Sequence, residues 1–190
     1  MRKNIDDSRG GSATKIFGIR DWECPSLLRE YYPDDLPEDW RLDYYANEFS
    51  VLAVPANKWR ALSEEDLEQW REDAGDQMLF LFETGGGDNA DAINVLKKIF
   101  STRFVALSEE SPDSTGLVQK RTCLTQNLTL CVFYITPINE SKTYLKELRT
   151  ELEAQLASCV GVQRLIFIVQ GEERLVETLE SVQILLDLMG

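Results

Sequence analysis

RLDYYANEFSVLAV, residues 41–54, places a helical pattern directly before a strand pattern. The apolar residues of its first part recur at the three- and four-residue spacing of one helix face, and they are Leu42, Tyr45, Ala46 and Phe49. The run over residues 49–54 is apolar except for Ser50, as in a strand covered on both faces. The stretch therefore predicts a helix over residues 40–48 and a buried strand over 49–54.

The same alternation continues on both sides of this stretch. Further strands are expected at residues 15–19, 78–82, 103–107, 128–135 and 164–169, with a short one at 117–119. Further helices are expected at residues 64–73 after an N-cap at Ser63, from a cap at Asp88 or Asn89 to Phe100, and at residues 141–158 and 172–189. Five or six βα units predict an α/β fold, either a barrel or an open doubly wound sheet.

Length, composition and charge limit the class of protein. A chain of 190 residues, 43% of them apolar, can bury one core, so we expect a flexible tail over residues 1–14 and a single domain over 15–190. The formal charge of −13 would repel a phosphate backbone, and no nucleic-acid partner is expected. No stretch approaches the roughly 18 apolar residues of a membrane span. We therefore expect a cytoplasmic protein without membrane association.

The cysteine and histidine content restricts the possible chemistry. Cys24, Cys123, Cys131 and Cys159 form no C-x-x-C pair, and three of them lie in or beside apolar runs, so buried free thiols are expected. The chain has no histidine, which excludes Ser-His and Cys-His nucleophile pairs and histidine ligation of a metal. No metal and no cofactor are predicted.

The N-terminal half carries an ordered series of motifs. They read GIRDW, YYPDDLP, RLDYYANEFSVLAV, NKWRAL and EQWRE. The series resembles the YecE-like bacterial family, the TIM barrels also known as domain of unknown function number 72. The matching residues are Gly18, Trp22, Tyr32, Pro33, Leu36, Pro37, Leu42, Tyr45, Ala46 and Phe49. The stretches LTLCVFYITP, RLIFIVQG and ESVQILLDLMG are similar, more weakly, to the last strands and helices of that family.

The resemblance implies a TIM-barrel-like α/β fold that is incomplete or degenerate. A full eight-unit barrel usually needs about 250 residues. Residues 108–127 have the composition of an irregular connection and are too few for the units that the family places there. We therefore expect a shortened barrel with about six βα units.

The resemblance also predicts lost chemistry at the strand ends, where TIM barrels carry their catalytic groups. The family typically has Glu and Asn at the second strand, whereas this chain has Ala53 and Pro55. A Lys that ends the third strand is replaced by Glu83, and an Arg followed by His-Gly is replaced by residues 134–137. The Asn pair of the eighth strand is replaced near residues 169–170. We expect no catalytic residue and a pseudoenzyme.

Some side chains near the strand ends remain candidates for ligand binding. Trp22 follows the first strand and Trp59 follows the second, so both could flank one pocket together with Asn57, Arg60 and Glu83. Packing at the rim is an equal alternative for the two tryptophans. Trp40 and Trp70, by contrast, are expected to pack within helices.

Acidic side chains offer a second kind of site. Glu64, Glu65, Glu68 and Glu72 line the outer face of one expected helix. A solvated face is the plain interpretation, and the alternative is docking to a basic protein partner. Asp21 and Glu23, with Glu83, could instead form a divalent cation site.

Two loops carry further expectations. Residues 84–88 read TGGGD between a strand and a helix, where backbone N–H groups can hold a phosphate, although the lack of a nearby basic residue favours a shortened loop. A barrel that loses strands leaves two open edges. We expect residues 108–127 to cover this gap, or another chain to do so, with the strand at 128–135 as the contact of a possible homo-oligomer.

Two functions remain open from the sequence. The first is a non-catalytic binding or scaffolding protein on a decayed YecE-like barrel, which engages a protein partner through acidic surfaces. The alternative is a small hydrolase or lyase acting on a sugar or phosphorylated metabolite through Glu83, Asp21 or Glu23.

Overall fold

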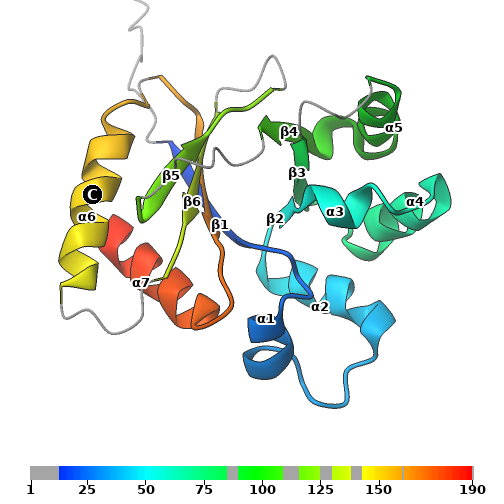
Figure 1. Ribbon diagram of the computed structural model, residues 1–190, viewed down its shortest axis with the longest axis horizontal. Coiled ribbons are helices and arrows are strands. Elements are labelled where there is room, and N and C mark those ends of the chain that lie inside the picture. The colour runs from blue at the N-terminus through cyan, green and yellow to red at the C-terminus, as the bar shows by residue number, and fades with distance from the viewer. Residues whose placement is uncertain are drawn as a thin grey trace, which may run out of the picture.

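The computed structural model describes residues 13–84, 90–108, 116–124, 130–137, 143–159 and 161–189. These residues form one seven-stranded sheet with helices packed against it, which confirms the α/β class (Figure 1). The strands are β1 (Thr14–Arg20), β2 (Val51–Val54), β3 (Leu79–Thr84), β4 (Phe104–Ser108), β5 (Val118–Arg121), β6 (Leu130–Ile135) and β7 (Arg164–Val169). All seven lie within two residues of the strands predicted from sequence.

The strand order is β4-β3-β2-β1-β7-β6-β5. Six strands run parallel, and β5 alone pairs antiparallel, with β6. β1 lies at the centre because the chain winds outward from it to β4 and later returns to its other side with β7. Parallel strands of this kind need crossover connections, and helices supply them here.

Residues 116–124 connect the two outer parallel strands. Val118 to Arg121 pair with β6, and Cys123 then bridges to Leu107 of β4. Two backbone hydrogen bonds fix this contact, from Ser108 N to Thr122 O at 3.0 Å and from Leu124 N to Ala106 O at 2.8 Å. The expectation that residues 108–127 cover the gap is therefore confirmed for residues 116–124.

The helices are α1 (Pro25–Glu30), α2 (Arg41–Glu48), α3 (Ala56–Trp59), α4 (Glu64–Asp73), α5 (Ala90–Phe100), α6 (Tyr144–Leu156) and α7 (Leu175–Leu188), with short 3-10 turns at Glu38–Trp40 and Ser101–Arg103. In Figure 1, α6 and α7 lie on one side of the strands and α3, α4 and α5 on the other. The helix α1 was missed from sequence because six residues are too few to show a helical period.

The two faces of the sheet pack in different ways. One face contacts the helices, and the other forms a cluster made of strand residues only. That cluster contains Val51, Ala53, Leu79, Leu81, Val105, Leu107, Val132, Tyr134, Ile166 and Ile168. Because no helix covers these side chains, the sheet buries them by curling on itself. Gly18 permits this close packing, since a Cβ atom there would overlap the carbonyl oxygen of Val51.

Three packing predictions are wrong. Trp40 is not a packing residue, because it ends a 3-10 turn and leaves 60% of its surface exposed. Cys131 and Cys159 are not free, since they form a disulfide between β6 and the end of α6. The strand β6 offers no free edge to another chain, because β7 and β5 flank it. A homo-oligomer stays a prediction, but β6 cannot be the strand through which two copies pair.

Some predictions lie outside the described residues. These are the N-terminal tail over residues 1–12, the glycine loop at 85–87 and the helix cap at Asp88 or Asn89. Within the described part of the chain, no helix has both the length and the apolar character to cross a membrane.

Candidate functional site

A cluster of polar side chains lies at the carboxyl ends of the parallel strands, where α/β folds place their sites. Arg20 ends β1 and Glu83 lies near the end of β3. Tyr134 lies near the end of β6, and Arg121 faces the same interior because it pairs opposite Val132. We call these four side chains the mouth cluster.

Arg20 and Glu83 form a two-point ion pair within the mouth cluster. Arg20 Nε donates to Glu83 Oε1 at 2.7 Å, and Arg20 Nη2 donates to Glu83 Oε2 at 2.9 Å. The side chain of Glu83 is 9% exposed and that of Arg20 is 37% exposed. The hydrogen bond to Glu83 raises the pKa of Arg20 above its ordinary value. Both carboxylate oxygens are therefore occupied by a guanidinium that stays charged.

Tyr134 and Arg121 complete the mouth cluster. The guanidinium of Arg121 lies 4.6 Å from the centre of the Tyr134 ring, a cation–π contact. The Tyr134 hydroxyl is buried and has no hydrogen-bond partner among the described residues. Burial, and after it the charge of Glu83, raise the pKa of Tyr134 well above 10. Tyr134 therefore stays neutral and does not act as a base near pH 7.

A second charged group lies beside the first and centres on Lys58. Its Nζ contacts Asp21 Oδ1 at 2.6 Å and Glu23 Oε2 at 2.7 Å, and it lies 4.9 Å from the Trp22 ring centre. Asp21 adopts a positive φ of 64°, which turns the chain out of β1 and brings its carboxylate to the Glu23 backbone N–H. Lys58 thus bridges the two carboxylates, and Arg41 Nη1 also lies 3.9 Å from Glu23 Oε1.

The structure brings only some of the predicted ligand residues together. Trp59 is buried, and its Nε1 donates to the Glu83 carbonyl oxygen at 2.9 Å. Arg60 lies over the Trp59 ring at 5.7 Å. Trp22 is buried and meets Trp70 edge to face with ring centres 4.5 Å apart. The two tryptophans therefore pack at the rim.

Asn57 is exposed on the short helix α3 and completes the predicted set. Ligand binding by these residues stays a prediction.

The carboxylates proposed for a divalent cation lie in separate ion pairs. Asp21 and Glu23 contact Lys58, whereas Glu83 contacts Arg20. Across the described ranges, no three acidic or cysteine side chains are grouped so that they could hold a metal ion. The geometry thus gives no support to the cation site considered from sequence.

The acidic helix α4 forms as its sequence predicts. Ser63 Oγ accepts from the Asp66 backbone N–H, and the Asp66 carboxylate accepts from the Ser63 backbone N–H. This capping box fixes the start of the helix, and Leu67 faces the core. The four predicted partner residues, Glu64, Glu65, Glu68 and Glu72, are all exposed. Among the residues that the structure describes, Glu72 alone of these four has an ion pair, with its neighbour Arg71.

Three residues of these clusters were missed from sequence. Arg20 and Lys58 were not named as site residues, although each follows an apolar strand closely. Arg121 lies in a stretch whose composition indicates an irregular loop, so its burial carried no sequence signal. The resemblance predicted a loss of catalytic groups at the strand ends. Polar side chains are still present there, and they contact one another.

A family model matches the N-terminal part of the chain. Residues 16–86 match the model of the family described as Protein of unknown function DUF72. This match over part of the chain agrees with the resemblance seen in the N-terminal motifs. No curated protein and no solved structure gives a significant match to the chain.

Proposed function

We propose that this chain is a non-catalytic binding or scaffolding protein, built on a shortened YecE-like TIM barrel of about six parallel strands. In this proposal β5 and residues 122–124 take the place of the missing barrel units. A protein partner of basic character docks on the acidic face of α4. The protein works in the cytoplasm as a pseudoenzyme.

The two-point pair between Arg20 and Glu83 carries the first half of the proposal. A general acid or base needs a carboxylate that can release and take up a proton near the operating pH. Glu83 instead gives both oxygens to a permanently charged guanidinium. Asp21 and Glu23 are held by Lys58 in a similar way. The carboxylates that a hydrolase or lyase would need as acid or base are thus held in ion pairs.

The exposure of α4 supports the second half. Its four outer glutamates project from a helix whose start is fixed by a capping box, so the charges sit on a rigid element. With a formal charge of −13 on the whole chain, a basic partner would be attracted over a long range. Such complementarity accelerates association more than it deepens affinity.

Affinity capture from the cells that make this protein tests the proposal. The intact chain is compared with a Glu65→Lys/Glu68→Lys variant, and with a control variant Glu147→Lys/Asp187→Lys that makes the same charge change on α6 and α7. These helices lie on the opposite side of the strands from α4 (Figure 1). We expect one basic protein bound by the intact chain and the control, and lost from the α4 variant. Equal loss from both variants, or no such protein, would contradict docking on α4.

A further inference from the structure

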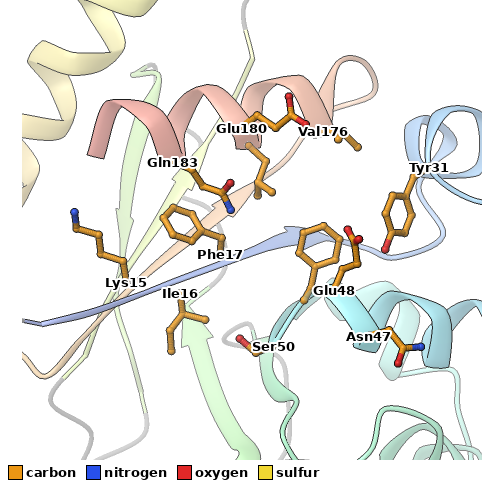
Figure 2. A pocket seen from close by; sticks show the side chains of 12 residues that line it. Lys15, Ile16, Phe17, Tyr31, Asn47, Glu48, Ser50, Val176, Glu180 and Gln183 are labelled. Atoms are coloured by element: carbon orange, nitrogen blue, oxygen red, sulfur yellow. The ribbon is translucent and has the colours of Figure 1, made fainter. Parts of the chain in front are cut away.

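A groove of about 460 Å³ runs along the first half of β1, away from the mouth cluster at the end of that strand. Figure 2 shows its walls: α7 lies on one side, and the end of α2 with the chain leading into β2 lies on the other. Its volume is in the range of small-molecule sites, about 300–1,000 Å³. Nothing in the mouth cluster contributes to it.

Aromatic and aliphatic side chains line one part of the groove. Phe17 comes from β1, Phe49 precedes β2, and Tyr31 follows α1. Tyr31 and Phe49 lie with ring centres 5.8 Å apart. Val176 and Leu179 add aliphatic surface from α7. This lining favours a ligand with an apolar body.

Two carboxylates line opposite walls of the groove. Glu48 comes from the end of α2 and Glu180 from α7 (Figure 2). Both are exposed, and neither forms a hydrogen bond or an ion pair with any residue that the structure describes. Lys15 is the one cation of the lining, and its Nζ donates to the Leu186 carbonyl oxygen at 2.7 Å. Lys15 lies at the other end of the groove from Tyr31 (Figure 2).

Two neutral polar side chains lie near Glu48. The Tyr31 hydroxyl is buried and has no hydrogen-bond partner among the described residues. Burial first, and then the charge of Glu48, raise the pKa of Tyr31 above its ordinary value of 10, so the hydroxyl stays protonated. Asn47 donates its amide N–H to the Asp43 carbonyl oxygen, which leaves its own side-chain oxygen as an acceptor.

We propose that this groove binds a small organic cation, namely a protonated amine on an aromatic or branched aliphatic body. The ammonium group would lie between Glu48 and Glu180, where both carboxylates attract it. The apolar body would lie against Phe17 and Phe49. The site lies apart from α4, so it does not depend on the docking proposed above.

Titration calorimetry with three probes of one size tests the chemistry. The probes are phenethylamine, 2-phenylethanol and 3-phenylpropanoate, which are cationic, neutral and anionic near pH 7. We expect the amine to bind at least about 10-fold more tightly than the alcohol, a difference of about 1.4 kcal/mol, and the acid to bind more weakly still. Equal binding of amine and alcohol, or no binding of the amine, would overturn the proposal.

Variants locate the site. Glu48→Gln/Glu180→Gln should weaken amine binding about 10-fold or more and leave the alcohol unchanged, since it removes charge with little change of shape. Glu147→Gln/Glu153→Gln on α6 makes the same chemical change elsewhere and should leave both affinities unchanged. The two glutamates of the groove are exposed, so equal melting temperatures are expected and serve as the folding control. Unchanged amine affinity in the groove variant would refute the assignment.

A fourth probe tests whether the groove binds a small free amine or the lysine side chain of a protein partner. A capped pentapeptide of glycines around one lysine presents the same ammonium group on a chain. We expect it to bind at least about 10-fold more weakly than phenethylamine, because the peptide backbone adds no apolar body that fits the aromatic lining. Peptide binding as tight as that of the amine would contradict a small-molecule site.

Discussion

Replacing Arg20 by methionine is expected to lower the free energy of unfolding by about 2 kcal/mol. The change removes two charge-assisted hydrogen bonds and leaves the Glu83 carboxylate, whose side chain is 9% exposed, without its cation. Breaking a fully buried pair in this way costs about 3–5 kcal/mol. Arg20 keeps 37% of its side-chain surface in solvent, so screening reduces the expected cost to about 2 kcal/mol.

A double-mutant cycle isolates the interaction from the other effects of each change. Arg20→Met, Glu83→Leu and the double variant are unfolded in urea at pH 7, and the transition is followed by tryptophan fluorescence. Trp22 and Trp59 are buried near the pair and report its loss. We expect a coupling energy of about 1–2 kcal/mol, within the usual range for contacting groups. A coupling energy below about 0.5 kcal/mol would refute the claim that Glu83 is held by Arg20.

Three further predictions follow from local geometry. Gly18→Ala should lower the free energy of unfolding by about 2–3 kcal/mol in urea, because the new methyl group overlaps the backbone of β2; an unchanged midpoint would contradict the close strand packing. Ser63→Ala should cost about 1 kcal/mol at pH 7 by loss of the N-cap. The hydrogen bond to Ser63 lowers the pKa of Asp66 from its ordinary value of 3.8. The capping pair therefore stabilises the folded state fully above about pH 4, and this stabilisation is lost as the pH falls through the lowered pKa. Urea unfolding of the variant and the intact chain at pH 7 and pH 3 measures the difference. Reducing the disulfide Cys131–Cys159, whose cysteines lie 28 positions apart, should cost about 3 kcal/mol, measured with and without dithiothreitol; a Cys159→Ser variant should then show no effect of reductant.

The regular elements were predictable because their signals are local. Each parallel strand is a short apolar run, and α4 begins where Ser63 supplies the cap and acids supply the first turn. The antiparallel strand β5 was expected only as a short segment within a polar connection. Its pairing with β6, and the bridge from Cys123 to β4, depend on residues far away in the chain, so no local pattern encodes them.

The candidate sites were only partly predictable. Glu83 was singled out because it departs from the family pattern at a strand end, and Trp59 because it follows a strand. In the structure Glu83 contacts Arg20, and Trp59 contacts the Glu83 backbone. Each contact joins residues more than 20 positions apart. The groove was not predicted, since Glu48 of α2 and Glu180 of α7 lie far apart in the sequence.

The sequence by itself determined the α/β class, the order of strands and helices, the resemblance of its N-terminal part to one family, and the net negative charge. These properties depend on composition and short-range spacing. Only the tertiary structure decided which charges neutralise one another at the strand ends and which remain unpaired in the groove beside β1. The physical reason is that an ion pair depends on distances of a few ångströms between side chains, and those distances are set when the sheet curls and brings remote strands and helices together.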